Sequence, residues 1–164
     1  MSETKEKEHL PFYGPGPFYG AVVIGLTVLA VICRNVSFLR SGKIEMLHLP
    51  MLILGVLLII AGAALWIYAV PISKIDDGIR DNRLVTNGAY ALVRNPIYSA
   101  IMIACTGVLL TTGNLWFMIL PVLFWTFMTF LMKATEEKWL KDLYGREYED
   151  YCRKVNRCWP WFSR

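Results

Sequence analysis

Four apolar runs most constrain what this chain of 164 residues can fold into. They cover residues 17–33, 46–70, 97–112 and 115–132. Because an α-helix rises about 1.5 Å per residue, roughly 20 residues cross the ~30 Å hydrocarbon core of a bilayer. The second run is long enough and the fourth nearly is, whereas the first crosses if Pro17 and Arg34 lie at the interfaces. The third run is short.

Only residues 111–114 separate the third run from the fourth, which predicts an antiparallel helical hairpin. The composition also indicates a membrane protein, since 18% of the residues are charged against about 25% in soluble domains. The sequence therefore predicts an all-α, polytopic membrane protein with four transmembrane helices, in a single domain over residues 1–164.

The basic residues predict the orientation in the membrane. If both termini are cytoplasmic, fourteen of the 17 Lys and Arg residues lie inside, and Arg34, Arg40 and Lys43 lie outside. This distribution follows the positive-inside rule. It explains the net charge of +4 by topology and by affinity for anionic lipid headgroups, so nucleic-acid binding is not expected. Residues 1–10 lack a small-residue cleavage site and are not typical of a signal peptide.

Two small features are interpreted as structural. The doubled PFYG at residues 11–14 and 17–20 is typical of aromatic, Pro and Gly residues at a membrane interface, although it could bind something. The four cysteines (Cys33, Cys105, Cys152 and Cys158) include no Cys-x-x-Cys pair, and the histidines are His9 and His48 alone. The sequence therefore predicts neither a metal site nor a redox dithiol.

A polar loop at residues 72–95 leads into the third apolar run. Asp76-Asp77-Gly78 and Asn87-Gly88 are turn signals, because Gly takes a positive φ at no steric cost. Asn95 is a good N-cap candidate, and Pro96 suits the first turn of a helix. These residues could therefore serve only to start a helix.

The segment 133–157 follows the last apolar run, and its apolar residues recur every three or four positions. This spacing predicts a cytoplasmic amphipathic helix that continues the fourth span and is interrupted near Gly145. Glu137 could pair with Lys141, four residues later, and Glu136 with Lys133. Two adjacent carboxylates directly after a membrane span are nevertheless unusual, since one of them must face toward the bundle.

The predicted hairpin brings residues 90–98 and the Glu136-Glu137 pair to the same cytoplasmic end. Carboxylates and aromatic ring faces stabilise a cationic centre, and Arg94 can pair with a carboxylate. A ligand with a positive centre, a carboxylate and a flat base fits these groups. S-adenosyl-L-methionine has these features.

The segment LVTNGAYALVRNPIYSA (84–100) resembles the signature before the penultimate helix of the isoprenylcysteine carboxyl methyltransferase family, Leu-Val-x-x-Gly-x-Tyr-x-x-x-Arg-His-Pro-x-Tyr. The segment EEKWLKDLYGREYEDYCRKVNRCWP (136–160) resembles the end of that family's sequences. The resemblance covers about the last 80 residues, with a signature region at about 84–160. Asn95 stands where the prenylcysteine enzymes usually have His, and Asn-Pro-x-Tyr before a Glu-Glu pair also resembles phosphatidylethanolamine N-methyltransferases.

The resemblance implies a set of residues around the cofactor. They are Leu84, Val85, Gly88, Tyr90, Asn95, Pro96, Tyr98, Glu136 and Glu137. It also implies catalytic roles for Glu136, Arg94 and Arg157. We expect Glu136 to orient the cofactor or stabilise its sulfonium, and Arg94 or Arg157 to hold a carboxylate or phosphate of the acceptor. Asn95 can hydrogen-bond the cofactor but cannot carry a charge.

These features favour S-adenosyl-L-methionine-dependent methyl transfer to a lipophilic or small acceptor, through a carboxylate, thiol or amine, at the cytoplasmic membrane face. An NADPH-dependent reductase of the sterol-reductase type is an alternative, with Arg80, Arg83 and the Arg153-Lys154 pair left for a 2′-phosphate. A non-enzymatic membrane scaffold is another, and it would explain the spans and the aromatic residues Trp159, Trp161 and Phe162. The small residues of the second run (Gly55, Gly62, Ala63 and Ala64) suit close helix packing within one chain or between copies.

Overall fold

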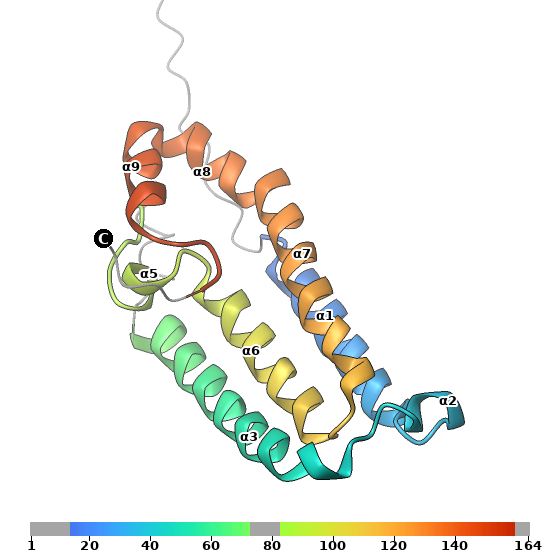
Figure 1. Cartoon of the computed structure of the whole chain (residues 1–164). Helices are drawn as coiled ribbons and strands as arrows, with labels where there is room; N and C mark the ends of the chain where they lie inside the picture. Colours follow the sequence, from blue (N-terminus) through green and yellow to red (C-terminus); the bar gives the residue numbers. More distant parts are fainter. Residues whose placement is uncertain (1–13, 73–82, 160–164) are drawn as a thin grey trace, which may run out of the picture.

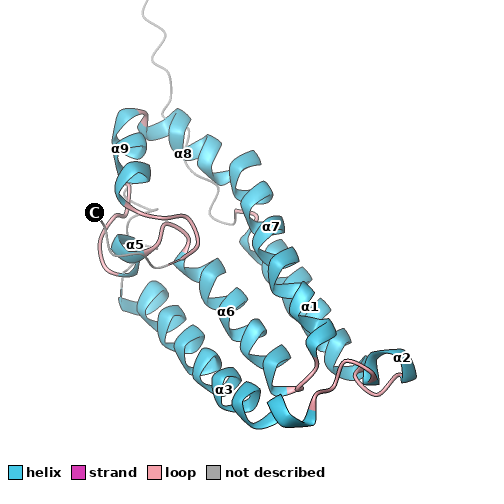
Figure 2. Ribbon diagram, viewed as in Figure 1, coloured by secondary structure: helices cyan, strands magenta, loops and turns pink. Residues whose placement is uncertain are grey.

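The computed structural model describes residues 14–72 and 83–159 (Figure 1). These residues form helices joined by short loops, and no named strand lies among them (Figure 2). The helices are α1 (Gly16–Cys33), α2 (Ser37–Arg40), α3 (Glu45–Ile67), α5 (Ala89–Leu92), α6 (Pro96–Thr111), α7 (Ile119–Ala134), α8 (Glu136–Tyr144) and α9 (Arg146–Lys154). A π-helical turn (Tyr68–Ile72) extends α3, and a 3₁₀ turn (Leu115–Met118) precedes α7.

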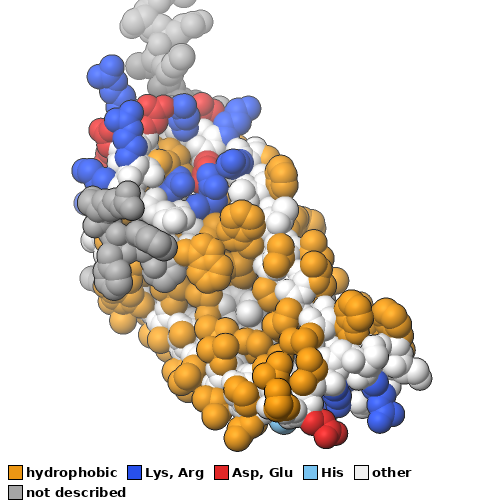
Figure 3. All heavy atoms as spheres, in the orientation of Figure 1, with side chains coloured by type: hydrophobic (Ala, Val, Ile, Leu, Met, Phe, Trp, Pro, Cys, Tyr) orange, Lys and Arg blue, Asp and Glu red, His pale blue; other side chains and the backbone are white. Residues whose placement is uncertain are grey.

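Helices occupy all four predicted apolar runs. Three are long and apolar enough to cross a membrane: Gly16–Cys33, Glu45–Ile72 and Leu115–Tyr144. The helix α6 has 16 residues and rises about 24 Å, so the count of four spans stays a prediction. In Figure 3 hydrophobic side chains cover the middle of the visible face, and charged side chains gather at its two ends. The all-helical prediction is confirmed for the described residues.

The helix α6 lies between α3 on one side and α1 and α7 on the other (Figure 1). Its Tyr98, Met102 and Leu109 belong to the main hydrophobic core. Tyr19 from α1 and Met128 from α7 pack into the same core and are fully buried. The shortest of the four apolar helices is therefore the one that the others enclose.

Small residues hold α3 directly against the backbone of α6. A Cβ on Gly55 would lie 2.7 Å from the Gly107 carbonyl oxygen. A Cβ on Gly62 would lie 2.8 Å from both the Ala100 carbonyl oxygen and the Ala104 nitrogen. Two of the four small residues that the sequence singles out thus pack inside one chain. The other two, Ala63 and Ala64, are exposed.

The α6–α7 connection forms the predicted hairpin. Gly113 takes a φ of 65°, which a residue with a side chain rarely adopts. The buried Asn114 donates from Nδ2 to the Leu39 carbonyl at 2.8 Å and accepts from the Trp116 backbone N–H at 3.0 Å. The hairpin is therefore also tied to α2.

Past the hairpin, the predicted helical continuation of the last span is divided at two points. Thr135 has φ −125° and ψ −89° and separates α7 from α8. Gly145, at φ 53°, separates α8 from α9, where the sequence predicts an interruption. Tyr148, Tyr151 and Val155 pack in a second hydrophobic cluster, so α9 folds back over the end of the bundle (Figure 1).

Several sequence predictions fall outside the described residues. They are the Asp76–Gly78 turn, His9, the first PFYG copy apart from Gly14, and the interfacial Trp161 and Phe162.

We expect Gly62→Ala to lower stability by about 1–3 kcal/mol, because its Cβ meets backbone atoms that cannot move independently. Gly25→Ala in α1 is the matched control, since a Cβ there meets nothing within 4 Å. Thermal unfolding of the purified variants in detergent measures the stability of each. Equal unfolding temperatures for the two variants would contradict this packing.

Candidate functional site

The backbone after α9 docks on the residues that begin α6. The Arg94 N–H donates to the Asn156 carbonyl at 2.8 Å, and the Asn95 N–H donates to the Arg157 carbonyl at 3.2 Å. Asn95 Nδ2 donates to that same Arg157 carbonyl at 3.2 Å, and Ser99 Oγ donates to the Cys158 carbonyl at 2.7 Å. These bonds hold two segments about 60 residues apart side by side.

Asn95 occupies the predicted N-cap position of α6, but its side chain makes no capping hydrogen bond. Its amide is used instead to hold the Arg157 backbone, and the residue is buried. The prediction of the helix start is therefore confirmed, with Pro96 in the first turn, while the capping role is wrong.

A short helix completes this end of the molecule. Gly88, with φ 58°, begins α5, as its turn signal predicts. Tyr151 in α9 donates its hydroxyl proton to the Tyr90 carbonyl at 2.6 Å. Burial raises the pKa of the Tyr151 phenol, which keeps it protonated as a donor. The α5 turn is thus fixed to α9.

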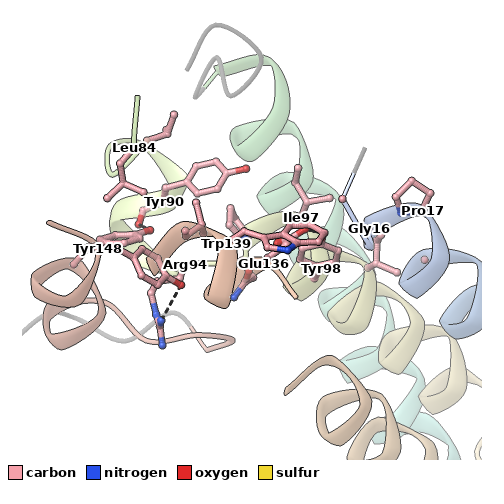
Figure 4. Close-up of a pocket in the computed structure, with 18 of the residues that line it drawn as sticks. Gly16, Pro17, Leu84, Tyr90, Arg94, Ile97, Tyr98, Glu136, Trp139 and Tyr148 are labelled. Carbon is pink, nitrogen blue, oxygen red and sulfur yellow. Dashed lines mark hydrogen bonds between the residues drawn. The ribbon is translucent and has the colours of Figure 1, made fainter. Parts of the chain in front are cut away.

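A cavity of about 560 Å³ lies between these elements and the start of α1 (Figure 4). Eight residues predicted for the methyltransferase site line it: Leu84, Val85, Tyr90, Arg94, Asn95, Pro96, Tyr98 and Glu136. Arg83, which the reductase alternative leaves for a 2′-phosphate, lines it too. Gly88, Glu137 and Arg157 are not among the lining residues. Sequence reasoning missed Gly14, Gly16, Trp139, Leu140, Tyr144 and Tyr148 in the lining. The spacing of Tyr144 and Tyr148 in a helical segment was the available signal for those two.

Glu136 faces the cavity from the start of α8. The Tyr98 hydroxyl donates a hydrogen bond to Glu136 Oε1, so the carboxylate is tied to α6. Both side chains line the cavity together with Trp139 (Figure 4). The predicted pairing of Glu136 with Lys133 is replaced by this contact.

Glu137 points to a different set of partners. Arg157 donates from Nε to Oε1 at 2.5 Å and from Nη2 to Oε2 at 2.8 Å, and Arg94 Nη1 lies 3.3 Å from Oε1. The Glu137 side chain is 16% exposed. Its hydrogen bonds raise the pKa of Arg157 above the usual value, so this guanidinium stays charged. The predicted Glu137–Lys141 pair is wrong, because Lys141 pairs with Glu149 at 2.8 Å.

Arg94 lies between Glu137 and the cavity. Its Nη1 donates to the Tyr148 hydroxyl at 3.4 Å, drawn as a dashed line in Figure 4, and to Cys152 Sγ at 2.7 Å. Its Nε is buried and has no hydrogen-bond partner among the described residues. A buried donor without an acceptor costs about 1–3 kcal/mol. The site therefore offers a fixed positive charge with an unused donor.

In the described part of the chain, no cluster of three or more His, Cys, Asp or Glu residues could hold a metal ion. The functional groups described at the cavity are the Glu136 carboxylate, the Arg94 guanidinium and several aromatic rings.

Comparisons with known proteins find related methyltransferases. The family model described as phospholipid methyltransferase matches residues 50–147. A probable protein-S-isoprenylcysteine O-methyltransferase from Oryza sativa subsp. indica is 32% identical over 83 residues, which cover 50% of this chain and 43% of that relative. A protein-S-isoprenylcysteine O-methyltransferase from Schizosaccharomyces pombe is 36% identical over 77 residues, which cover 46% of this chain and 32% of that relative. The match thus spans less than half the length of either relative, and no solved structure matches.

We expect Glu137→Gln to destabilise the protein by about 3 kcal/mol, because two largely buried guanidinium groups lose their anion. Glu149→Gln is the matched control, since its pair with Lys141 lies at the surface, where ion pairs contribute little to stability. The unfolding temperature in detergent checks both variants. A Glu137→Gln protein as stable as the Glu149→Gln protein would show that the Glu137 cluster does not hold the C-terminal segment.

Proposed function

The chain belongs to the phospholipid methyltransferase family, and from this premise we propose that it transfers a methyl group from S-adenosyl-L-methionine to an acceptor at the membrane. With three helices long and apolar enough to cross a bilayer, it is an integral membrane protein. The proposed enzyme is one domain over residues 1–164, with its site residues at about 84–160.

One observation carries the proposal: a carboxylate, fixed by a tyrosine, faces an aromatic-lined cavity of about 560 Å³. This volume lies within the ~300–1,000 Å³ range of small-molecule sites. When bound, the cofactor supplies a methyl group on a positively charged sulfur. The Glu136 carboxylate would attract that charge, and the Tyr98 hydroxyl would keep the carboxylate in one orientation.

The remaining lining residues suit the other parts of the same cofactor. The Arg94 guanidinium lines the cavity, and a ligand carboxylate would pair with its positive charge. Tyr90, Trp139 and Tyr148 present rings to the cavity, which suits a flat base. Leu84, Val85, Asn95 and Pro96 would complete the cofactor contacts.

The arginines take different roles in this proposal. Arg94 lines the cavity and is the candidate for holding a ligand carboxylate or phosphate. Arg157 has its Nε and Nη2 engaged by Glu137. We therefore assign Arg157 and Glu137 to positioning Arg94, in place of the direct ligand contacts that the resemblance implies.

A lipophilic acceptor fits the opposite wall of the cavity. That wall is apolar and consists of Pro17, Ala21 and Ile24 of α1 and Ile97 and Ile101 of α6. The two relatives are named as methyltransferases of isoprenylcysteine, a lipophilic group. Holding such an acceptor in line with the methyl group could lower the barrier by about 7–11 kcal/mol through positioning alone.

The proposed topology has four transmembrane helices, with α6 as the short one, and an amphipathic segment formed by α8 and α9. Both termini and the cavity would lie on the cytoplasmic side. The distribution of Lys and Arg supports this orientation, because in this topology fourteen of the 17 would lie on the cytoplasmic side.

Titration of the full chain in detergent with S-adenosylmethionine, S-adenosylhomocysteine and NADPH tests the function. Both adenosyl ligands should bind. Glu136→Gln should lower the affinity for S-adenosylmethionine about tenfold more than the affinity for S-adenosylhomocysteine. The two ligands differ in the sulfonium charge, and a charged interaction of this kind contributes about 1.5–3 kcal/mol. The exposed Glu147→Gln is the control and should leave both affinities unchanged.

Binding of NADPH and of neither adenosyl ligand would refute the methyltransferase proposal and favour the reductase. No binding of any of the three ligands to folded protein would favour the scaffold.

A further inference from the structure

The start of α1 touches the Tyr98–Glu136 pair, although it lies outside the residues 50–147 that the family model matches. A Cβ on Gly14 would lie 2.6 Å from Glu136 Oε1 and 3.5 Å from Glu136 Cδ. A Cβ on Gly16 would lie 2.9 Å from the Tyr98 hydroxyl oxygen and 3.2 Å from Cε1. Both glycines also line the cavity.

Positions 14 and 16 require glycine because there is no room for a Cβ, and not because of the backbone conformation. The glycines with positive φ in the described chain are Gly88, Gly113 and Gly145. Gly14 and Gly16 are not among them, so an alanine would fit their backbone angles. What an alanine would meet is the carboxylate of Glu136 or the hydroxyl of Tyr98.

The glycine segment is anchored on its C-terminal side. Pro15 precedes α1 and accepts a hydrogen bond from the Tyr19 N–H at 3.0 Å. Tyr19 is fully buried, and its ring meets the Tyr98 ring edge-on at a centroid distance of 5.5 Å. The α1 backbone is therefore held by a core residue, whereas the Glu136 carboxylate is the end of a flexible side chain that one hydrogen bond from Tyr98 holds. A methyl group on residue 14 would displace the carboxylate before it displaced the helix.

We propose that Gly14 and Gly16 are positioning residues: they let the start of α1 close over Tyr98 and Glu136 and confine the carboxylate to the orientation in which it faces the cavity. This inference rests on the proposed function, in which Glu136 recognises a sulfonium. A charged group that is fixed before the reaction stabilises charge without reorganising. The first helix thus completes a site whose phenol comes from α6 and whose carboxylate comes from α8.

The test uses the full chain in detergent with Gly14→Ala, Gly16→Ala and the control Gly25→Ala, at whose Cβ nothing lies within 4 Å. Gly14→Ala should reduce the preference for S-adenosylmethionine over S-adenosylhomocysteine about tenfold, as a lost charged contact would. Gly16→Ala should act in the same direction, and Gly25→Ala should leave the preference unchanged. In a Glu136→Gln background, Gly14→Ala should have no further effect on the preference, because both changes act through one carboxylate.

A second readout does not depend on the ligand. Gly14→Ala should lower the unfolding temperature by a few degrees, and this loss should disappear in a Glu136→Ala background, where the contact is absent. If Gly14→Ala lowered the unfolding temperature equally in the unmodified chain and in the Glu136→Ala background, the contact between residue 14 and Glu136 would be refuted. If the effects of Gly14→Ala and Glu136→Ala on the unfolding temperature depend on each other, but Gly14→Ala leaves the ligand preference unchanged, the positioning role would be refuted. Failure of the unmodified chain to bind either adenosyl ligand would refute the proposed function and this role with it, while the stability cycle would still decide the contact.

Discussion

The Glu137 carboxylate is the interaction on which the rest of the site depends. It accepts two hydrogen bonds from Arg157 and lies 3.3 Å from Arg94, so it joins α8 to the residues before α6 and to the segment after α9. Successive residues of a helix point about 100° apart, since a turn takes 3.6 residues. With Glu137 directed at the arginines, Glu136 is directed at Tyr98 and the cavity.

This arrangement gives the two adjacent acids different tasks. Glu137 is paired with two arginines and contributes to structure, whereas the partner of Glu136 is a neutral phenol, and we propose that its carboxylate meets the ligand. A cationic ligand would find no competing Lys or Arg on Glu136 within the described residues. The Arg94 Nε is buried and has no acceptor among the described residues.

The sequence predicts the local features well because they depend on local physics. Four apolar runs place the four main helices, Gly88 and Gly145 take the positive φ expected of turns, and Pro96 begins α6. Eight of the residues singled out as site residues line the cavity, although their roles stay proposals. The resemblance to a known family supplies much of this set, because the spacing alone does not separate a helix start from a ligand site.

What the sequence does not predict depends on contacts between distant residues. The i, i+4 rule assigns Glu137 to Lys141, but a better partner, Arg157, lies 20 residues away and becomes a neighbour through the turn at Gly145. The Asn95 side chain holds the Arg157 backbone and not its own helix end for the same reason. The PFYG repeat suggests an interface, whereas the glycines Gly14 and Gly16 are needed for a contact with residues of α6 and α8.

The most direct test is an experimental structure of the full chain with S-adenosylmethionine bound. The account predicts that the ligand occupies the cavity between α1, α6 and α8, with its sulfonium near Glu136 and Glu137 still paired with Arg157. A ligand whose sulfonium contacts Glu137, with Arg157 released, would contradict the division of roles between the two carboxylates.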